Sequence, residues 1–262
     1  MKNLYTLALI TGATSGIGEE FAKQLPEATN LILTGRNTEK LTQMQSVLQT
    51  QTRTVKIIAA DLATPEGLAS LTEKIKDEPI DLFINNAGLG YFGAMQTHTF
   101  SQEDAMVQVN IVAMAALTRA LCPQMAKYAK AQNKAAGVIF VSSVAGFMAV
   151  PGFATYAATK MFGLSLAEAL AEEYKNTPLQ IQALCPGPTN TQFGARAGMP
   201  QHIKNTSMAA QDVVALSLKN LGKKRIVVPG LLNRASVWPA RLLPRTWLTR
   251  LTATFIERTK KT

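Results

Sequence analysis

Short hydrophobic runs alternate with longer segments of helical periodicity along most of this chain. The runs are rich in β-branched and aliphatic residues, which predicts strands at Leu7–Ile10, Leu31–Thr34, Val55–Ala59, Leu82–Ile84, Val138–Val141 and Ile181–Leu184. The segments between them predict helices at Gly18–Leu25, Asn37–Gln49, Pro65–Lys76, Ser101–Lys130 and Ala154–Tyr174, with Thr64 or Asp61 and Ser101 as entry caps. This alternation predicts an α/β fold with a Rossmann-type, doubly wound parallel sheet and helices on both faces.

The elements follow one another without a linker rich in Pro, Gly or Ser, and no internal repeat is visible. We therefore expect a single domain. Residues 1–218 would form its Rossmann core with the binding and catalytic groups. Residues 219–262 would add the last strand and a basic extension rich in Leu, Trp and Arg.

The net charge of +10 belongs to that extension. Residues 1–218 hold 16 basic and 16 acidic residues, whereas residues 219–262 hold 11 basic residues and one acid, Glu257. The core is therefore neutral, and the excess charge does not indicate a nucleic-acid-binding domain. Only 17% of residues are charged and 47% are hydrophobic, which is typical of a folded globular domain.

The cysteine count and the first residues bear on location. Cys122 and Cys185 lie in unrelated contexts without metal-ligand spacing, which favours a reducing compartment. Strand-like sequence begins at Leu4 with no room for a signal peptide before it, and we expect no later run long enough to span a bilayer. We expect a cytoplasmic protein, with a peripheral contact at a membrane surface left open.

A glycine-rich turn, Thr11-Gly12-Ala13-Thr14-Ser15-Gly16-Ile17-Gly18, follows the first strand and opens a helix. Glycine allows backbone N–H groups to approach phosphate oxygens, and a helix N-terminus favours negative charge. The spacing is G-x-x-x-G-x-G and differs from the common G-x-G-x-x-G fingerprint. An ordinary strand-to-helix turn is the alternative, but the position at the first βα junction favours a dinucleotide pyrophosphate.

The end of the second strand bears on the choice of cofactor. An NAD site usually places an acid here for the ribose 2′-hydroxyl, yet no acid occurs before Glu39. Arg36 offers a guanidinium suited to a 2′-phosphate, so we expect NADP(H). A purely solvated role for Arg36 is the alternative.

Four further segments complete a recognisable set. Asn85-Asn86-Ala87-Gly88 ends the fourth strand, Asn110 lies in the next helix, Ser142-Ser143 ends the fifth strand, and Tyr156-Ala157-Ala158-Thr159-Lys160 opens another helix. With the glycine turn, this chain resembles the short-chain dehydrogenase/reductase family. The resemblance runs from about Leu4 to Thr191 in the family's order and spacing. It implies hydride transfer between nicotinamide and a carbonyl or alcohol carbon.

Tyr156 and Lys160 are four residues apart and so share one helix face. A nearby ammonium favours the phenolate and would lower the tyrosine pKa toward the range of a general acid/base. Tyr156 would then donate a proton to the carbonyl oxygen in reduction and accept one in oxidation. The resemblance implies that Lys160 also holds the nicotinamide ribose.

Ser143 lies 13 residues before Tyr156, which is the family's spacing, and would hydrogen-bond the substrate oxygen as charge develops there. Ser142 is the less favoured of the two serines. Asn110 resembles the family asparagine whose backbone holds a water in a proton relay to the lysine. Each residue alone has an ordinary structural explanation, and the catalytic interpretation depends on the whole set.

The resemblance extends to further cofactor contacts. Asp61 and Leu62 resemble the position that meets adenine, Asn86, Ala87 and Gly88 would line the cleft, and Thr191 would meet the nicotinamide amide. The predicted cofactor-binding set is Gly12, Thr14, Ser15, Gly16, Ile17, Gly18, Arg36, Asp61, Leu62, Asn86, Ala87, Gly88, Tyr156, Lys160, Pro186, Gly187, Thr189 and Thr191. Pro188 and Thr189 occupy positions where the family varies. No metal is expected, because His98 and His202 lack ligand spacing.

Three segments expected at the cleft are strongly apolar: Leu89–Gly93, Phe147–Phe153 and Phe193–Met199. They suit a hydrophobic ketone, aldehyde or 3-oxoacyl substrate, or else they pack against one another or a second subunit. Two functions without turnover are the alternatives: a nucleotide sensor, which would not need Tyr, Lys and Ser together, and a membrane-surface adaptor.

The long helices rich in Ala, Met and Leu predict a homodimer or homotetramer, since the corresponding helices form subunit interfaces in the family. In the tail, arginines alternate with Leu and Trp between residues 231 and 251. This composition suits weak contact with an anionic membrane. Alternatively, Leu242, Leu243, Trp247 and Leu251 cover the cleft or a neighbouring subunit. Pro239 and Pro244 predict short pieces rather than one long helix.

Overall fold

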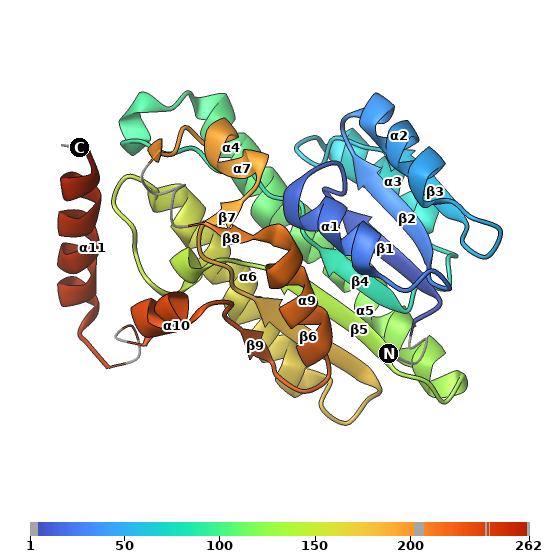
Figure 1. Cartoon of the computed structure of the whole chain (residues 1–262). Helices are drawn as coiled ribbons and strands as arrows, with labels where there is room; N and C mark the ends of the chain where they lie inside the picture. The colour runs from blue at the N-terminus through green and yellow to red at the C-terminus, as the bar shows by residue number, and fades with distance from the viewer. Residues whose placement is uncertain (1–4, 202–206, 239, 241, 261–262) are drawn as a thin grey trace.

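A seven-stranded parallel sheet forms the centre of the computed structural model, which describes residues 5–201, 207–238, 240 and 242–260 (Figure 1). His202 and Pro239 lie outside the described residues. The strand order is β3-β2-β1-β4-β5-β6-β9, and β7 and β8 form a separate two-stranded sheet. The strands are β1 (Leu7–Thr11), β2 (Asn30–Gly35), β3 (Val55–Ala59), β4 (Leu82–Asn85), β5 (Ala136–Val141), β6 (Leu179–Leu184), β7 (Thr189–Asn190), β8 (Met208–Ala209) and β9 (Ile226–Val227).

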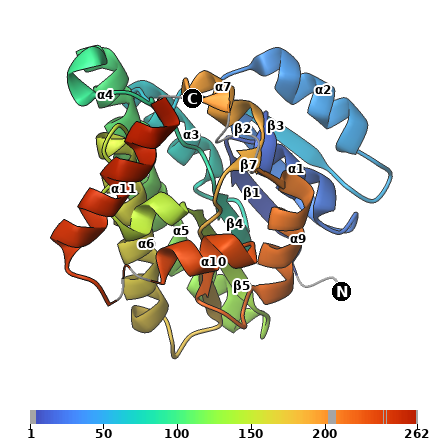
Figure 2. The ribbon, with the colours of Figure 1, turned by 60° about the vertical axis from the view of Figure 1, so that its left-hand side comes forward.

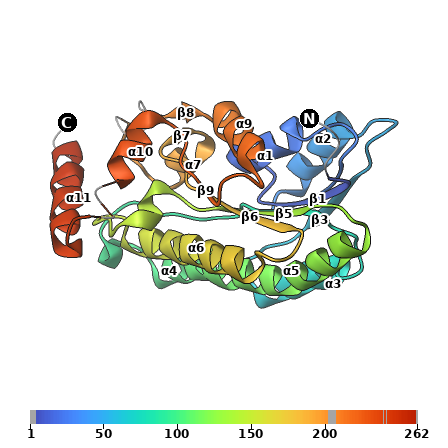
Figure 3. The same ribbon diagram turned by 90° about the horizontal axis from the view of Figure 1, so that it is seen from below.

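Helices cover both faces of the sheet, so the fold is a single-domain, doubly wound Rossmann type as predicted (Figure 3). One face carries α1 (Gly16–Gln24), α2 (Thr38–Leu48) and α9 (Ala210–Asn220). The other carries α3 (Pro65–Ile75), α4 (Phe100–Val107), α5 (Met114–Ala131) and α6 (Ala154–Glu173). Shorter elements are η1 (Met95–Thr97), the π-helical η2 (Gln108–Ala113), η3 (Val144–Phe147), α7 (Gln192–Arg196) and α10 (Leu231–Val237), and α11 (Arg245–Lys260) ends the described chain.

The burial of the strands follows from their positions in the sheet. Every residue of β4 and β5 is buried, because helices pack on both faces of these central strands. The edge strand β3 instead has two buried residues, Val55 and Ile58, and two exposed residues, Lys56 and Ala59. The six strands predicted from the sequence are therefore confirmed, with ends extended by up to two residues.

The helical segment predicted at Ser101–Lys130 is divided into three pieces. It begins after Thr99, whose side chain and Gln102 form a reciprocal capping box, so the expected Ser101 cap is wrong. The π-helical turn η2 then separates α4 from α5. At α3, Thr64 accepts a hydrogen bond from Gly67 N and is the cap, rather than Asp61.

One helical stretch in the described part of the chain, Phe100–Ala131, is long and apolar enough to cross a membrane by length and composition alone. Half of its most apolar window is buried within the fold. That burial is what a core helix of a folded domain requires, so the stretch gives little support to a membrane span.

Both cysteines are free thiols in the core. Cys122 lies on α5 and is 2% exposed, and Cys185 follows β6 and is fully buried. Burial raises the pKa of each thiol to about 12. Both groups are therefore neutral and shielded from solvent in the native fold.

The C-terminal extension first adds β9 beside β6 and then forms two helices against the body (Figure 2). The carbonyl of Pro244 accepts hydrogen bonds from Trp247 N and Leu248 N, at 3.0 and 3.2 Å. Pro244 therefore precedes a helix of 16 residues, and the expectation of short pieces only is wrong beyond it.

The side chains that face the body also differ from the prediction. Leu248 and Ile256 are buried, whereas Leu242, Leu243, Trp247 and Leu251 are exposed. These four residues therefore do not cover the cleft in this chain.

Candidate active site

The glycine-rich turn lies where β1 and β4 adjoin, which is the point at which the strand order reverses. Gly12 and Gly16 have φ values of +64° and +58°, which L side chains rarely adopt. A Cβ on Gly18 would lie 2.4 Å from the Gly12 carbonyl oxygen, and one on Gly12 would lie 2.9 Å from Ala87 Cα. Only glycine fits these positions, and the turn leads into the N-terminus of α1, where backbone N–H groups favour a phosphate group.

The remaining residues of the turn connect it to its surroundings. Ser15 is the N-cap of α1, yet its hydroxyl makes no capping hydrogen bond. A Cβ on Gly35 would lie 2.9 Å from Thr14 Cγ2, so Thr14 packs on the end of β2. Ile17 packs against the core cluster on the α1 face of the sheet. The predicted residues of the turn are therefore brought together in one loop.

Arg36 directly follows β2 and is exposed. Among the residues that the structure describes, it takes part in no ion pair, and the following acid, Glu39, is also exposed. Thr14 and Gly35 place Arg36 next to the glycine-rich turn. Its guanidinium is free to meet an anionic group beside the turn.

Asn86 joins the end of β4 to the turn after β1. Its side-chain amide donates to the carbonyls of Thr11 and Gly12, at 2.8 and 3.1 Å. In return, the Thr11 hydroxyl accepts from the backbone N–H groups of Asn86 and Ala87, at 2.9 and 3.0 Å. These bonds fix the floor of the cleft, and a Cβ on Gly88 would lie 3.2 Å from Lys160 Nζ.

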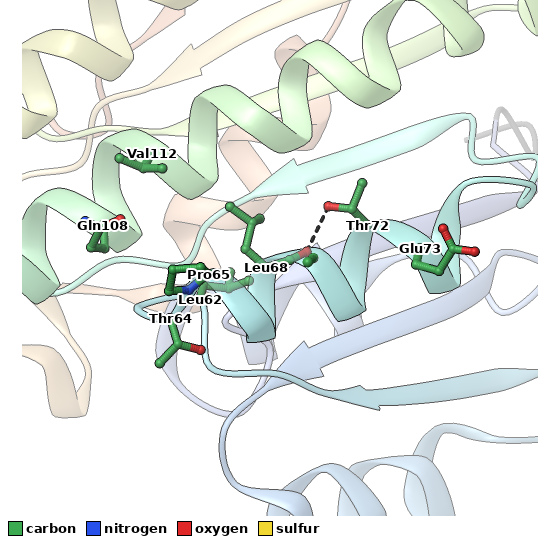
Figure 4. A pocket seen from close by; sticks show the side chains of 9 residues that line it. Leu62, Thr64, Pro65, Leu68, Thr72, Glu73, Gln108 and Val112 are labelled. Carbon is green, nitrogen blue, oxygen red and sulfur yellow. Dashed lines mark hydrogen bonds between the residues drawn. The ribbon is translucent and has the colours of Figure 1, made fainter.

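Asp61 and Leu62 end the β3 side of the cleft. The Asp61 carboxylate accepts from Ala63 N at 3.0 Å, which stabilises the turn into α3. Leu62 is 7% exposed and borders a shallow hollow of about 460 Å³ between α3 and η2 (Figure 4). This hollow contains none of the four predicted catalytic residues.

Tyr156 and Lys160 lie on the first turns of α6, as their spacing predicts. Lys160 Nζ is 5.6 Å from the centre of the Tyr156 ring and donates to the Val141 carbonyl at 2.9 Å. Burial lowers the pKa of Lys160 to about 8. Burial also raises the pKa of Tyr156, while a hydrogen bond from Ser143 acts in the opposite direction. The expected lowering of the Tyr156 pKa by Lys160 is therefore wrong, because burial of the phenol has the larger effect on its pKa.

The two serines after β5 have different environments. Ser142 is buried and donates to the Lys160 carbonyl at 2.6 Å, so it holds α6 in place. The Ser143 hydroxyl accepts from Ala145 N at 3.1 Å and approaches the Pro186 carbonyl at 3.4 Å. Of the two, Ser143 is the one directed toward the Tyr156 oxygen.

Asn110 is fully buried in the π-helical turn η2. Its side chain accepts from Leu89 N and donates to Leu89 O, both at 2.8 Å, and it also donates to Thr159 Oγ1 at 2.9 Å. Asn110 thus connects the loop after β4 to α6 beside the catalytic pair. A π-turn at this point is typical of functional sites in helices.

The loop after β6 closes the site from the opposite side. The Pro186 carbonyl accepts from Val144 N at 3.0 Å, and Gly187 lies so close to Asn233 of α10 that a Cβ would be 2.2 Å from its Oδ1. The Thr189 hydroxyl donates to the Gly187 carbonyl at 3.0 Å. Thr191 caps α7, and a Cβ on Gly16 would lie 3.0 Å from the Thr191 Cβ. The predicted loop therefore lies against the glycine-rich turn.

Two residues on α7, both within the apolar segment Phe193–Met199 expected at the cleft, take specific positions in the site. Arg196 donates to the Ser15 hydroxyl at 3.2 Å, across 181 positions of the chain. Phe193 lies over the Tyr156 ring, with a centroid separation of 5.4 Å. The sequence places both residues in this segment, but no spacing rule relates Arg196 to the glycine-rich turn.

The three apolar segments meet over the catalytic tyrosine. Phe153 stacks on Tyr156 at 4.3 Å, and Phe92 meets Phe153 edge-on at 5.6 Å. Tyr91, Val150 and Met199 complete this aromatic wall. The segments therefore pack on one another, which was one of the two alternatives, and they leave Tyr156 only 7% exposed. A substrate reaches Tyr156 only if part of this wall moves.

Metal ligation has no support in this arrangement. Within residues 5–201, 207–238, 240 and 242–260, no three His, Cys, Asp or Glu side chains gather in a way that could hold a metal ion. His98 Nδ1 lies 2.7 Å from Glu103 Oε1, which joins the loop before α4 to that helix. His98 is thus a partner in a local pair.

The glycine cradle at the switch point and the Tyr–Lys pair define a dinucleotide-dependent oxidoreductase. A family model described as short chain dehydrogenase matches residues 6–201, and the chain belongs to that family. Such enzymes interconvert carbonyl and alcohol groups.

Relatives and solved structures agree with this assignment. A 7beta-hydroxysteroid dehydrogenase of Mediterraneibacter gnavus is 30% identical over 240 residues, which are 88% of this chain and 89% of the relative. A short-chain dehydrogenase from Sphingobium yanoikuyae in complex with NADPH has a TM-score of 0.76 at 26% identity, covering 91% and 96% of the two chains. A family member from Burkholderia phymatum in complex with NAD has a TM-score of 0.78 at 23% identity, covering 90% and 93%, and supports the fold.

Proposed function

We propose that this chain is an NADP(H)-dependent reductase of hydrophobic ketones, with aldehydes and 3-oxoacyl compounds as further candidate substrates. The observation that carries the proposal is the meeting of Tyr156, Lys160 and Ser143 beneath an aromatic wall. The same residues would oxidise the corresponding alcohol in the reverse direction. A nucleotide sensor or membrane adaptor without turnover would have no use for this catalytic set.

The chain's own residues divide the chemistry between them. When bound, the nicotinamide supplies the hydride. The Tyr156 hydroxyl donates its proton to the substrate carbonyl oxygen, and Ser143 stabilises the charge that develops on that oxygen. Lys160 holds the ribose and keeps a positive charge beside Tyr156, and Asn110 supports the proton path from solvent through its position against α6.

The preference for NADP(H) rests on charge. Arg36 is exposed beside the turn, with no acid until Glu39, and Arg196 places a second guanidinium at Ser15. Of these two cations, Arg36 favours a cofactor with an additional phosphate. Arg36 would meet the 2′-phosphate, whereas Arg196 would meet the pyrophosphate that both cofactors share.

The substrate class follows from the wall over Tyr156. Phe92, Phe153, Phe193 and Met199 offer rings and a thioether and few hydrogen-bond partners. Such a surface favours a bulky apolar ketone over a sugar, whose hydroxyls would lose their hydrogen bonds to water. The relative named as a 7beta-hydroxysteroid dehydrogenase supports a substrate of this character.

We also propose a homodimer or homotetramer formed through the long helices. Phe100 is 86% exposed and Val112 is 41% exposed on this apolar stretch, although half of the stretch is buried within one chain. Light scattering at micromolar concentration tests the assembly, and a monomer would contradict it. A cytoplasmic location fits the two reduced, buried thiols.

The test of function is consumption of NADPH and NADH with a panel of substrates graded in size and polarity: bulky cyclic ketones, short ketones, aldehydes, 3-oxoacyl thioesters and sugars. We expect turnover with NADPH and the bulky ketones, and the lowest rate with the sugars. Cofactor binding without turnover on any member of the panel would favour the nucleotide sensor.

A further inference from the structure

Exposed apolar side chains are concentrated at the C-terminal end of the described chain. The described residues include 11 exposed large hydrophobic side chains, and seven of these lie between residues 231 and 251. Trp238, Leu242, Trp247 and Leu251 are 58 to 66% exposed, and Leu243 is 36% exposed. We call these five residues the tail face. Such a concentration of exposed apolar side chains in one segment points to a contact with another apolar phase.

Trp247 and Leu251 lie four positions apart on α11, so they share one side of the helix. The opposite side is already occupied, because Leu248 and Ile256 are buried against the body. The helix therefore has two apolar sides, of which only the inner one packs within the chain. Arg250 is exposed next to the outer side.

The inner side of α11 is held on the wall of the candidate active site. Thr252 Oγ1 donates to the Ala149 carbonyl at 2.9 Å, and a Cβ on Gly152 would lie 3.6 Å from Ile256 Cγ2. Phe153, the next residue, stacks on Tyr156. Figures 1 and 2 show α11 at the end of the molecule that carries the carboxyl edge of the sheet. Whatever binds the outer side of α11 is therefore held next to the cleft.

The excess of basic residues around the tail face indicates which kind of partner it can bind. Residues 231–251 contain four arginines and no acid, and residues 219–262 hold 11 basic residues and one acid. A second copy of this tail would bring like charges together, whereas an anionic surface would complement them. Trp and Leu enter the boundary between lipid head groups and acyl chains, and arginine pairs with lipid phosphates.

We propose that the tail face docks on an anionic membrane surface, with Trp247 and Leu251 inserted at the acyl boundary and Arg250 at the head groups. Docking would hold residues 149–153, which form part of the aromatic wall over Tyr156, at the bilayer. Apolar ketones would then enter the cleft from the lipid phase. This last consequence rests on the proposed function, whereas the docking itself does not.

The test is co-sedimentation of the full chain with phosphatidylcholine vesicles, with and without phosphatidylglycerol, at low and high salt. We expect binding to the anionic vesicles at low salt and a loss of at least about tenfold in the partition coefficient at high salt, because ions screen the arginines. Absence from the anionic pellet at low salt would overturn the proposal.

Two variants and two matched controls assign the binding to the tail face. The double variant Trp247→Ser with Leu251→Ser should lower partitioning by about tenfold or more, and Arg250→Glu should lower it severalfold. The controls are Val47→Ser, an exposed apolar residue on α2, and Lys134→Glu, an exposed cation after α5. Both controls should bind like wild type, and an equal loss in them would overturn the assignment.

Circular dichroism and thermal unfolding of the variants verify that they fold, since all five substituted positions face solvent. Light scattering of the double variant tests whether a second copy of this chain binds the tail face instead of a membrane. Dispersal of an oligomer by this variant, together with no vesicle binding by wild type, would identify an interface between copies and overturn the membrane proposal.

The proposed function is tested separately, with a water-soluble ketone and no vesicles. Vesicle binding without turnover would leave the docking intact and reject the enzyme. Turnover without vesicle binding would reject the docking alone. Where both hold, the double variant should keep its rate on the soluble ketone and lose rate only on a ketone delivered in vesicles.

Discussion

The cofactor side and the substrate side of the cleft are held together by different interactions. On the cofactor side, Asn86 and Thr11 exchange directional hydrogen bonds, and Gly18 permits a contact that no side chain could make. On the substrate side, Phe153 and Phe193 pack on Tyr156. Directional bonds fix one geometry, whereas apolar contacts can be exchanged for contacts with an apolar ligand. The difference indicates a preorganised nucleotide site beside a substrate site that must open.

Tyr156→Phe gives the largest expected effect, because the residue belongs to both sides. The variant keeps the stacked ring and removes only the proton donor, so turnover should fall by about 10²- to 10⁴-fold. Affinity for NADPH, measured by fluorescence titration, should stay close to that of wild type. Tyr174→Phe, at the far end of the same helix, is the control and should leave turnover unchanged. Substantial turnover by Tyr156→Phe would remove Tyr156 from the mechanism.

Arg36→Asp tests the charge of the cofactor side. It replaces a phosphate partner by an acid that repels phosphate and accepts from a 2′-hydroxyl. The ratio of kcat/KM for NADPH over NADH should fall by about 10- to 100-fold. Arg196→Gln should instead weaken both cofactors by the same factor, because its guanidinium lies at the shared pyrophosphate position. A ratio that Arg36→Asp leaves unchanged would contradict the assignment of the 2′-phosphate site.

Phe193→Ala removes the ring that closes the substrate side. Less packing then has to be broken for a substrate to reach Tyr156, so the KM for a bulky ketone should fall by about fivefold with little change in kcat. Phe193→Leu should give an intermediate KM. The unchanged affinity for NADPH would confirm that the effect is confined to this side. A raised KM for the bulky ketone would contradict this prediction, because it would show that contacts of the ring with the ketone outweigh the cost of displacing it from Tyr156.

The smallest expected effect is that of Lys160→Met on the pH dependence of the free energy of unfolding. Burial lowers the pKa of Lys160 to about 8 in the folded state, below its value of 10.5 in the unfolded chain. Between these values the unfolded chain binds more protons, so the Lys160 contribution to the free energy of unfolding rises with pH. The free energy of unfolding of wild type, relative to that of Lys160→Met, should therefore increase by about 1 kcal/mol from pH 8 to pH 9. Chemical denaturation at pH 8 and pH 9 measures this difference. The same difference at both pH values would contradict the buried-lysine assignment. Lys134→Met is the exposed control.

The predictability of each region follows from the range of the contacts that form it. Strands such as β4 and β5 were predictable because burial on both faces requires a continuous apolar run. The glycine-rich turn was predictable because its backbone shape is written in its own residues. Both are consequences of local sequence.

The remaining features depend on contacts between distant parts of the chain. The π-turn at Asn110 has no local signal, since its side chain is satisfied by Leu89 and Thr159. Likewise, Arg196 meets Ser15 only after α7 has folded over the cleft. The sequence does not predict the tail helix, because a proline in a chain segment is typical of a break, whereas the Pro244 carbonyl begins α11. Hydropathy also could not distinguish Leu248, which packs inward, from Trp247, which faces solvent.

The two buried thiols give this chain an advantage as a spectroscopic scaffold. Cys122 and Cys185 are inaccessible and neutral at physiological pH, so a maleimide or spin-label reagent should leave the native protein unmodified. A single cysteine introduced at an exposed position such as Val47 or Leu251 could then carry a dye without removal of the native pair. Slow labelling of the native pair would, in turn, report the rate at which the core opens.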